Sequence, residues 1–225
     1  MNVSMAINAC EVSFAQGKNF YKIFWIFFLC CFLGNCCEMV FAYAKTGKWI
    51  SRRGLIYGPL NQIYGMGAVL FVLSLYSLRN ANAGIIFLAS ALTGAAFEWL
   101  CSFVQEHLFR SRSWEYSNTP ANLDGRTNLF FALCWGLMGL VFIRNLYPWL
   151  SVRIERIPNN IGIPLSWVLI VFMAFDLLLS AMAVTRWAER TYNLHVPAET
   201  PLRRFLDRHY PDTRLRRIYT SLIFQ

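Results

Sequence analysis

Five long apolar runs limit what this chain can fold into more than any other feature of its sequence. They cover about residues 20–44, 59–78, 83–109, 127–150 and 162–187. Each has about 20 residues or more, the length that an α-helix needs to cross a hydrocarbon core of about 30 Å. The sequence therefore predicts an all-α fold, a polytopic transmembrane helical bundle of about five spans.

The composition agrees with a membrane environment. Hydrophobic residues make up 56% of the 225 residues and charged residues only 15%, so a water-soluble fold would have too little charge to cover its apolar side chains. Trp and Tyr are frequent, and both favour the headgroup region of a bilayer. We expect an integral protein of the plasma (inner) membrane with membrane lipid as its surroundings.

The apolar runs divide the chain into three parts. We expect a short N-terminal segment (residues 1–18), a single transmembrane domain (19–188) and a basic cytoplasmic tail (189–225). The first run is expected to be a retained span, because little positive charge precedes it and no small-residue cleavage site follows it. The tail is either a solvated basic segment or an interfacial amphipathic helix that touches anionic lipid or a partner.

The distribution of Lys and Arg predicts the orientation. The first loop (residues 45–58), the third loop (110–126) and the tail, counted with Arg186 just before it, hold fifteen of these residues. The other side of the membrane is expected to hold the remaining six. Positive residues favour the cytoplasmic side, so the N-terminus is predicted outside and the C-terminus in the cytoplasm. Because this pattern explains the net charge of +9, we expect no nucleic-acid partner.

The cysteines and histidines do not suggest a cofactor. Six of the seven Cys fall inside apolar runs, where small packing residues are common. Their spacing lacks the pattern of a zinc site, and the three His are scattered. We therefore expect no metal, no cofactor and no disulfide framework.

Acidic residues inside the spans are the candidates for function. A carboxylate in a bilayer costs at least a few kcal/mol unless it is protonated, paired or hydrated, which singles out Glu38, Glu98 and Asp176. In the third run, Glu98, Ser102 and Glu106 follow each other at intervals of four residues and so share one helical face. These acids either line a polar pathway or fix helix packing.

Two linkers are richer in polar and turn-forming residues than simple spacers. The first linker contributes three candidates, Arg53, Tyr57 and Tyr64. The second linker contributes five: Trp114, Glu115, Tyr116, Asn122 and Arg126. Irregular backbone is tolerated at membrane depth beside a cavity. The second linker could therefore fold back into the bundle, or it could be an ordinary interfacial loop.

The order and spacing of these motifs resemble a known family. They run from Gly34 with Glu38, through Arg53-Gly54 and Tyr57-Gly58-Pro59, to Glu98, Trp114-Glu115-Tyr116-Ser117, Asn122-Leu123-Asp124-Gly125-Arg126, Asp176 and Ser180. They resemble the CmpB family of type IV ABC-transporter permeases, and a eukaryotic multi-spanning family of unassigned function is similar in part. The likeness covers about residues 20–187. The chain departs from the family pattern at Asn35, Glu115 and Asp124.

Three functions stay open at this point. The first is a permease component that moves a small solute or ion through a polar cavity. The second is a membrane enzyme acting on a lipid-type substrate, with Arg53 or Arg126 holding a phosphate headgroup; no recognised nucleophile or metal motif supports it. The third is a structural or lipid-binding protein without catalysis.

The resemblance to a transporter family implies further partners. The chain has no Gly-x-x-x-x-Gly-Lys-[Ser/Thr] phosphate loop, so an ABC role would need a separate nucleotide-binding ATPase subunit. Five spans are few for a pathway, so a homodimer is a further expectation.

Overall fold

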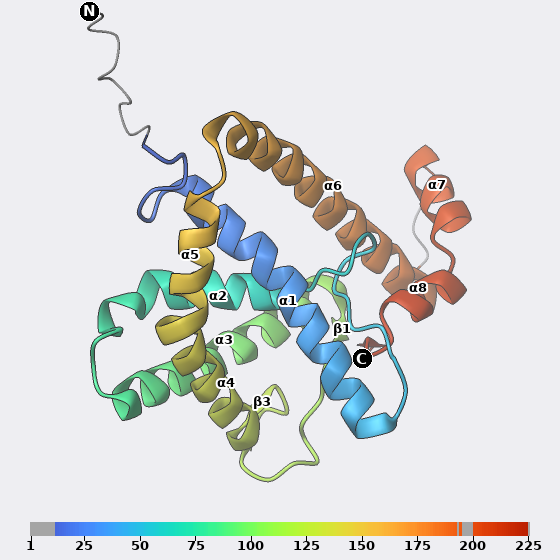
Figure 1. The fold of residues 1–225 in the computed structure, drawn as a ribbon. Coiled ribbons are helices and arrows are strands. Elements are labelled where there is room, and N and C mark those ends of the chain that lie inside the picture. Colours follow the sequence, from blue (N-terminus) through green and yellow to red (C-terminus); the bar gives the residue numbers. More distant parts are fainter. Residues whose placement is uncertain (1–11, 193, 195–199, 225) are drawn as a thin grey trace, which may run out of the picture.

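The computed structural model describes residues 12–192, 194 and 200–224. The first eleven residues of the expected N-terminal segment, Cys10 among them, lie outside these ranges, as do residues 193, 195–199 and 225 of the tail. The described chain is almost entirely helical (Figure 1). The all-α prediction is confirmed.

The elements follow one another as a series of helices with four very short strands. In chain order they are α1 (Phe20–Thr46), α2 (Gln62–Ser74), η1 (Tyr76–Leu78), α3 (Ala83–Phe109), β1 (Ser111–Arg112), β2 (Asn122–Leu123), β3 (Thr127–Asn128), α4 (Leu129–Val141), η2 (Phe142–Leu146), α5 (Tyr147–Glu155), α6 (Asn159–Thr191), α7 (Pro201–His209), α8 (Asp212–Ile218) and β4 (Ile223–Phe224). The strands form two antiparallel pairs, β1 with β4 and β2 with β3.

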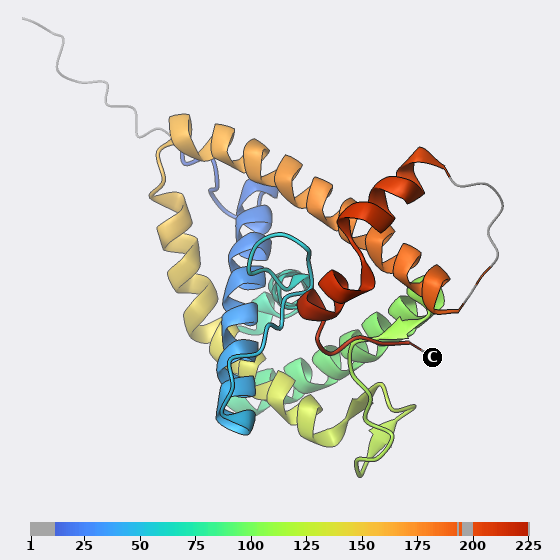
Figure 2. The same cartoon turned by 90° about the vertical axis from the view of Figure 1, so that its right-hand side faces the viewer.

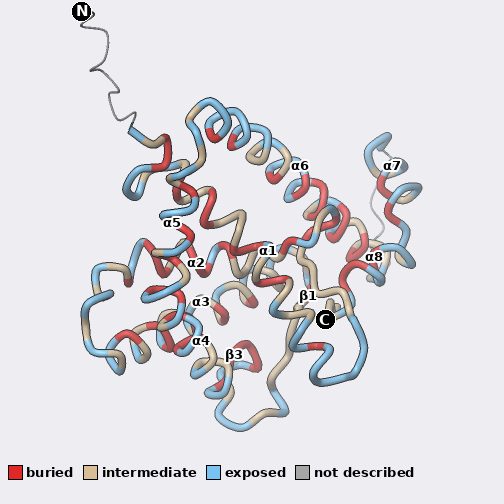
Figure 3. The backbone as a smooth tube through the Cα atoms, viewed as in Figure 1, coloured by how far each residue is buried: buried red, intermediate tan, exposed pale blue. Residues whose placement is uncertain are grey.

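Four helical stretches are long and apolar enough to cross a membrane. They are α1, α3, the continuous stretch Leu129–Glu155, and α6. Their outward faces carry exposed Leu, Val, Ile and Phe side chains, and Figure 3 shows buried and exposed positions alternating along α6. An exposed apolar surface on this scale suits lipid contact.

The stretch Leu129–Glu155 contains one turn of π-helix, η2. This turn includes Arg144. In a regular α-helix, the N–H of residue 148 would donate a hydrogen bond to the Arg144 carbonyl. Pro148 has no N–H to give. The wider turn lies where the regular bonding pattern is interrupted, and the helix continues through it.

The second apolar run forms a shorter helix than the expected residues 59–78. Helix α2 has 13 residues, which is about 20 Å at a rise of about 1.5 Å per residue. The reason is that the first loop, between α1 and α2, folds back along α1. Asn61 N donates to the Cys31 carbonyl at 2.9 Å, near the middle of α1, and the loop buries Leu55, Ile56 and Leu60. Four long helices and this shorter one therefore stand where five full spans were predicted.

The connections that were predicted to share one side of the membrane lie together. Ile56 of the first loop packs with Leu215 and Ile218 of α8, and Thr220 Oγ1 donates to the Ser51 carbonyl at 2.7 Å. Strand β1, which follows α3, pairs with β4 of the tail. The views in Figures 1 and 2 show β1 and the tail helices beside the C-terminal half of α6, with the first loop next to α8.

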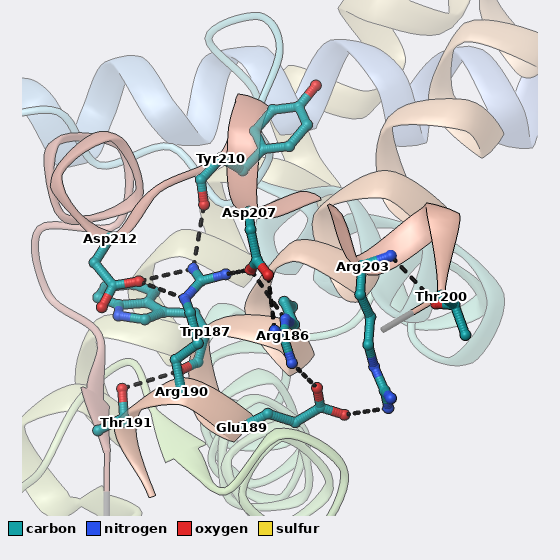
Figure 4. A network of polar contacts seen from close by, with 10 residues as sticks. All are labelled: Arg186, Trp187, Glu189, Arg190, Thr191, Thr200, Arg203, Asp207, Tyr210 and Asp212. Carbon is teal, nitrogen blue, oxygen red and sulfur yellow. Dashed lines mark hydrogen bonds and ion pairs between the residues drawn. The ribbon is translucent and has the colours of Figure 1, made fainter. Parts of the chain in front are cut away.

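The tail folds against the last turns of α6 through ion pairs. Arg186 and Arg190 both bind the carboxylate of Asp207, at 2.7 and 2.5 Å, and Arg190 also binds Asp212 at 2.7 Å. Glu189 binds Arg203 at 3.2 Å (Figure 4). The part of the tail that the structure describes is therefore a pair of packed helices, α7 and α8, with a charged contact to α6.

Candidate functional site

Glu98 of α3 is the best-connected acid of the bundle. It is only 6% exposed. Its Oε1 accepts a hydrogen bond from the Tyr116 hydroxyl at 3.2 Å, and its Oε2 accepts one from Thr127 Oγ1 at 2.8 Å. Tyr116 comes from the second linker, and Thr127 lies in β3 directly after it. The linker therefore does reach back into the bundle, through Tyr116.

Glu38 of α1 is bound in a similar way from α2. The Tyr64 hydroxyl donates to Glu38 Oε1 at 2.6 Å. The Tyr64 ring lies against the Trp135 ring, with centroids 6.3 Å apart. A Cβ atom at Gly34 would overlap the Tyr64 ring, so the glycine one turn before Glu38 makes room for this pair.

The structure brings Glu38 and Glu98 into one polar cluster. The carboxyl groups are within electrostatic range of each other, and Tyr116 is within range of both. Trp135 of α4 lies beside Tyr64 and is close enough to Glu98 to act on its carboxyl group. Four helices, α1 to α4, thus contribute to the cluster, which we call the acid cluster (Glu38, Tyr64, Glu98, Tyr116, Thr127 and Trp135).

Tyr116 remains a hydrogen-bond donor in this setting. Burial, followed by the neighbouring Glu98, raises the pKa of Tyr116 above its ordinary value. The phenol therefore keeps its proton, and the carboxyl oxygen of Glu98 is the acceptor. The Tyr116 ring also stacks on Phe131, with centroids 4.7 Å apart, which fixes its direction.

An ion-pair network begins at Glu106, two turns after Glu98 on α3. Glu106 Oε2 binds both Arg112 and Arg126 at 2.7 Å, and Arg112 also binds Glu115 at 2.5 Å. Hydrogen bonding to Glu106 raises the pKa of Arg112. Burial would raise the pKa of Glu115, but hydrogen bonds from Ser117 and Arg112 lower it to about 2. Arg112 and Glu115 are therefore both charged at neutral pH.

Ser102 lies between the acid cluster and this ion-pair network. The predicted stripe on α3 is present: Glu98 and Ser102 are buried and Glu106 is half-buried. Arg126 Nη1 lies 3.5 Å from Ser102 Oγ. The Arg126 guanidinium also lies over the Trp99 ring, 5.7 Å from its centroid. Ser102 thus links the two polar groups along one helical face.

Trp114 and Asn122 hold the shape of the second linker. Trp114 Nε1 donates to the Arg126 carbonyl at 2.7 Å. Asn122 donates to the Thr119 carbonyl at 2.7 Å and accepts from Gly125 N at 3.0 Å. These contacts are within the linker, so both residues position Tyr116, Arg126 and their neighbours.

Asp176 makes its contacts elsewhere. Its carboxyl oxygens accept from the backbone N–H of Tyr57 at 3.1 and 3.2 Å, and Ser180 Oγ donates to it at 3.3 Å. Asp176 is fully buried, and Arg53 is within electrostatic range of it. Asp176, Arg53 and Tyr57 thus form a separate group that ties the first loop to α6, away from the acid cluster.

Lys22 is a buried charge that sequence reasoning missed. Its side chain is fully buried near the start of α1 and binds Glu155 of α5 at 2.5 Å, with Ser151 Oγ also at 2.5 Å. The signal was its place inside an apolar run. Thr127, Trp135 and Arg112 were missed too. Of these, only Arg112 had a readable signal, its place between Glu106 and Glu115.

The acid cluster differs chemically from the ion-pair network. Within the described residues, neither Glu38 nor Glu98 forms an ion pair. Glu38 accepts a hydrogen bond from the Tyr64 hydroxyl, and Glu98 accepts hydrogen bonds from the hydroxyls of Tyr116 and Thr127. The same part of the chain holds no group of three or more His, Cys, Asp and Glu side chains that would suit a metal ion. The cluster can bind a proton or another positively charged group between two carboxyls.

Comparison with known proteins gives one match. No curated protein and no solved structure is significantly similar to the chain. The sequence profile of the family described as "Putative ABC-transporter type IV" matches residues 25–181. That range holds most of α1, all of α2 to α5 and most of α6, and with them the acid cluster and the ion-pair network. The chain therefore belongs to this family of ABC-transporter components.

Proposed function

We propose that the chain is the permease component of an ABC-type transporter and that it moves a positively charged small solute or ion past Glu38 and Glu98. The observation that carries this proposal is the bonding of the two carboxyls. Each is held by hydroxyl groups from neighbouring segments, and neither is neutralised by Lys or Arg in the described structure.

The free-energy cost of placing carboxylates in a membrane favours a functional role for Glu38 and Glu98. A membrane-embedded carboxylate costs at least a few kcal/mol unless it is protonated, paired or hydrated. A purely structural contact between these helices could be made by Gln or Thr without that cost. Hydroxyl partners accept both states of a carboxyl group, because an O–H can donate to the ionised form and accept from the protonated form.

The ion-pair network would sit at one end of this path. Arg112, Arg126 and Glu106 close the linker over the acid stripe of α3, and Ser102 connects them to Glu98. A passing solute has to part these contacts. This would make the second linker the moving part of the transport step and α3 its fixed wall.

An ATPase partner would supply the energy. Because the chain lacks a phosphate-loop motif, hydrolysis has to come from a separate subunit. The first loop, β1 and the tail, which contact one another, would be the docking site of that subunit. Native mass spectrometry of the protein extracted from its own membranes tests this: a stoichiometric nucleotide-binding subunit is expected, and a chain that arrives alone would contradict the ABC role.

Carbodiimide labelling tests the acid cluster without knowing the substrate. N,N′-dicyclohexylcarbodiimide reacts with protonated carboxyl groups at membrane depth. We expect mass spectrometry to find the label on Glu38 or Glu98. A cation that uses the site should protect against labelling, and the Glu38→Gln/Glu98→Gln variant should show none there.

Asp176 is the internal control for this experiment. It is a fully buried acid of α6, and both of its carboxyl oxygens are engaged by the backbone N–H of Tyr57. We expect no label on Asp176 under the same conditions. Glu38 and Glu98 that stay unlabelled would instead identify sealed structural acids and favour a structural or lipid-binding role.

A further inference from the structure

A pocket lies between the first loop and α8, away from the acid cluster. It has a volume of about 550 Å³ and is lined by eight residues: Arg53, Ile56, Tyr57, Gly58, Thr213, Arg214, Arg217 and Ile218. This volume falls within the range of about 300–1,000 Å³ that is common for small-molecule pockets. Three of the lining side chains are guanidinium groups, and none is acidic.

The three arginines are not neutralised by the protein. Among the described residues, Arg53, Arg214 and Arg217 form no ion pair, whereas the tail arginines at 186, 190 and 203 all do. Arg53 Nε is buried without a hydrogen-bond partner in that same part of the chain. Asp176 is within electrostatic range of Arg53, and its oxygens already bind the Tyr57 backbone.

Arg214 is held in place by other contacts. Its Nη1 donates to the His209 carbonyl at 2.7 Å, and its guanidinium lies 4.8 Å from the Tyr210 ring centroid. The Tyr210 hydroxyl is 2.8 Å from the Tyr57 hydroxyl. The pocket therefore combines a positioned guanidinium, two less constrained ones and a phenol, a donor set that suits the oxygens of a phosphate.

One wall of the pocket continues into the apolar surface of α6. The Tyr57 ring stacks on Phe175, with centroids 6.5 Å apart. Phe175 is 57% exposed, and Val171 and Leu178, four residues before it and three after it, are exposed on the same helical face. A molecule with its phosphate among the arginines could lay a hydrocarbon chain along this face.

We propose that this pocket binds the phosphate headgroup of an anionic lipid. Arg53, Arg214 and Arg217 bind the phosphate oxygens, and the acyl chains lie against α6 beside Tyr57. Arg126, the other arginine considered for a phosphate, is already occupied by Glu106 at 2.7 Å. The site is independent of the proposed transport path, because it shares no residue with the acid cluster or the ion-pair network.

Native mass spectrometry of the detergent-solubilised full chain tests the proposal. The protein is titrated with dihexanoyl phosphatidic acid and, separately, with dihexanoyl phosphatidylcholine. We expect one phosphatidic acid per chain, bound at least about tenfold more tightly than phosphatidylcholine. The Arg214→Gln/Arg217→Gln variant should weaken binding by about tenfold or more, since each charge-assisted hydrogen bond contributes about 1.5–3 kcal/mol.

A matched variant controls for net charge. Arg208→Gln/Arg216→Gln removes the same two charges from α7 and α8, at exposed positions that do not line the pocket. We expect binding by this variant to change by less than about twofold, because exposed charges are screened at physiological salt. Equal weakening in both double variants would overturn the pocket and leave general attraction to a basic tail.

A second variant guards against disturbance of the tail fold. Thr213 is an exposed lining residue in the first turn of α8, so Thr213→Glu adds a negative charge to the pocket with little effect on the helix. It should weaken phosphatidic acid binding as the arginine variant does; unchanged binding would overturn the site. Inorganic phosphate that binds as tightly as phosphatidic acid would overturn the lipid assignment and indicate a soluble phosphate compound.

Discussion

At the scale of single residues, the chain accommodates buried charge in two contrasting ways. Lys22 is neutralised by Glu155 and bonded by Ser151, an arrangement with little freedom to change. Glu38 and Glu98 are bonded by phenol and hydroxyl groups, an arrangement that tolerates a change of protonation. The first pattern stabilises the fold, and the second is the chemistry on which the transport proposal rests.

The Lys22 pair can be tested as a stabilising contact. Lys22→Met leaves Glu155 without its cation, and we expect the variant to lose about 1–3 kcal/mol of stability, less than for a fully buried pair because Glu155 is 35% exposed. Thermal unfolding in detergent, followed with a thiol-reactive fluorophore, measures this, because Cys30 and Cys31 are buried in the folded chain.

A second variant separates charge from packing at this site. Lys22→Met/Glu155→Gln removes both charges, so it should recover at least about half of the lost stability. A double variant as unstable as Lys22→Met would contradict the ion-pair explanation and assign the effect to the packing of the lysine stem.

At the scale of elements, one carboxylate of α7 binds two arginines of α6. Asp207 accepts hydrogen bonds from Arg186 at 3.0 and 2.7 Å and from Arg190 at 2.5 Å. Asp207→Asn should release this contact, and hydrogen exchange of residues 201–218 should become about tenfold faster or more. Arg208→Gln, on the exposed face of α7, is the control and should leave exchange unchanged.

The same contact has a predictable dependence on pH. The hydrogen bond from Arg186, and then that from Arg190, lower the pKa of Asp207 below its ordinary value. A lowered folded-state pKa stabilises the fold above the unfolded pKa of about 3.9 and stops doing so as pH falls through the folded value. Exchange of α7 should therefore be constant from pH 8 to pH 5, after correction for the intrinsic rate, and faster below about pH 4.

Most of the helices could be predicted from the sequence, because long apolar runs have few alternatives in a membrane. The run 83–109 matches α3, and the first and last runs match α1 and α6 to within a few residues. The start and length of α2 could not be predicted. Leu55, Ile56 and Leu60 are apolar whether they lie in a helix or in a loop that folds back, so hydropathy does not distinguish the two.

The candidate site was predictable along one helix and not between segments. Intervals of four residues place Glu98, Ser102 and Glu106 on one face whatever surrounds them. The approach of Tyr116 and Thr127 to Glu98 depends on the path of the second linker. The bonding of Asp176 to a backbone N–H of the first loop likewise depends on the irregular path of that loop. The spacing of residues along the sequence carries no information about the path of either segment.

At the scale of the whole molecule, the positive-inside rule predicts that the basic connections lie on one side of the membrane and the remaining connections on the other. Lys48, Asn118 and Arg208 represent the first side, and Asn80 and Asn160 the second. Single Cys substitutions at these positions, with Cys10 and Cys37 replaced by Ser, should react with a membrane-impermeant maleimide as two groups. We expect the first group to be labelled in inverted vesicles and the second in intact cells.

The result decides both sidedness and the crossing of α2. If Asn80→Cys were labelled from the same side as Lys48→Cys, α2 would not cross the membrane, and the N-terminus-outside prediction would lose its basis. Labelling of the two groups in the reverse compartments would contradict the cytoplasmic placement of the tail while keeping the five crossings.

The pairing of β1 with β4 connects the C-terminal strand of the described chain to the ion-pair network around Glu106. Phe224 pairs with Ser111, and Ile223 pairs with Arg112, whose guanidinium holds Glu106 and Glu115 together. A partner subunit that binds the tail and moves it would therefore also move the strand that contains Arg112. Force applied from outside the bundle would reach the ion pairs of α3 through two residues of backbone.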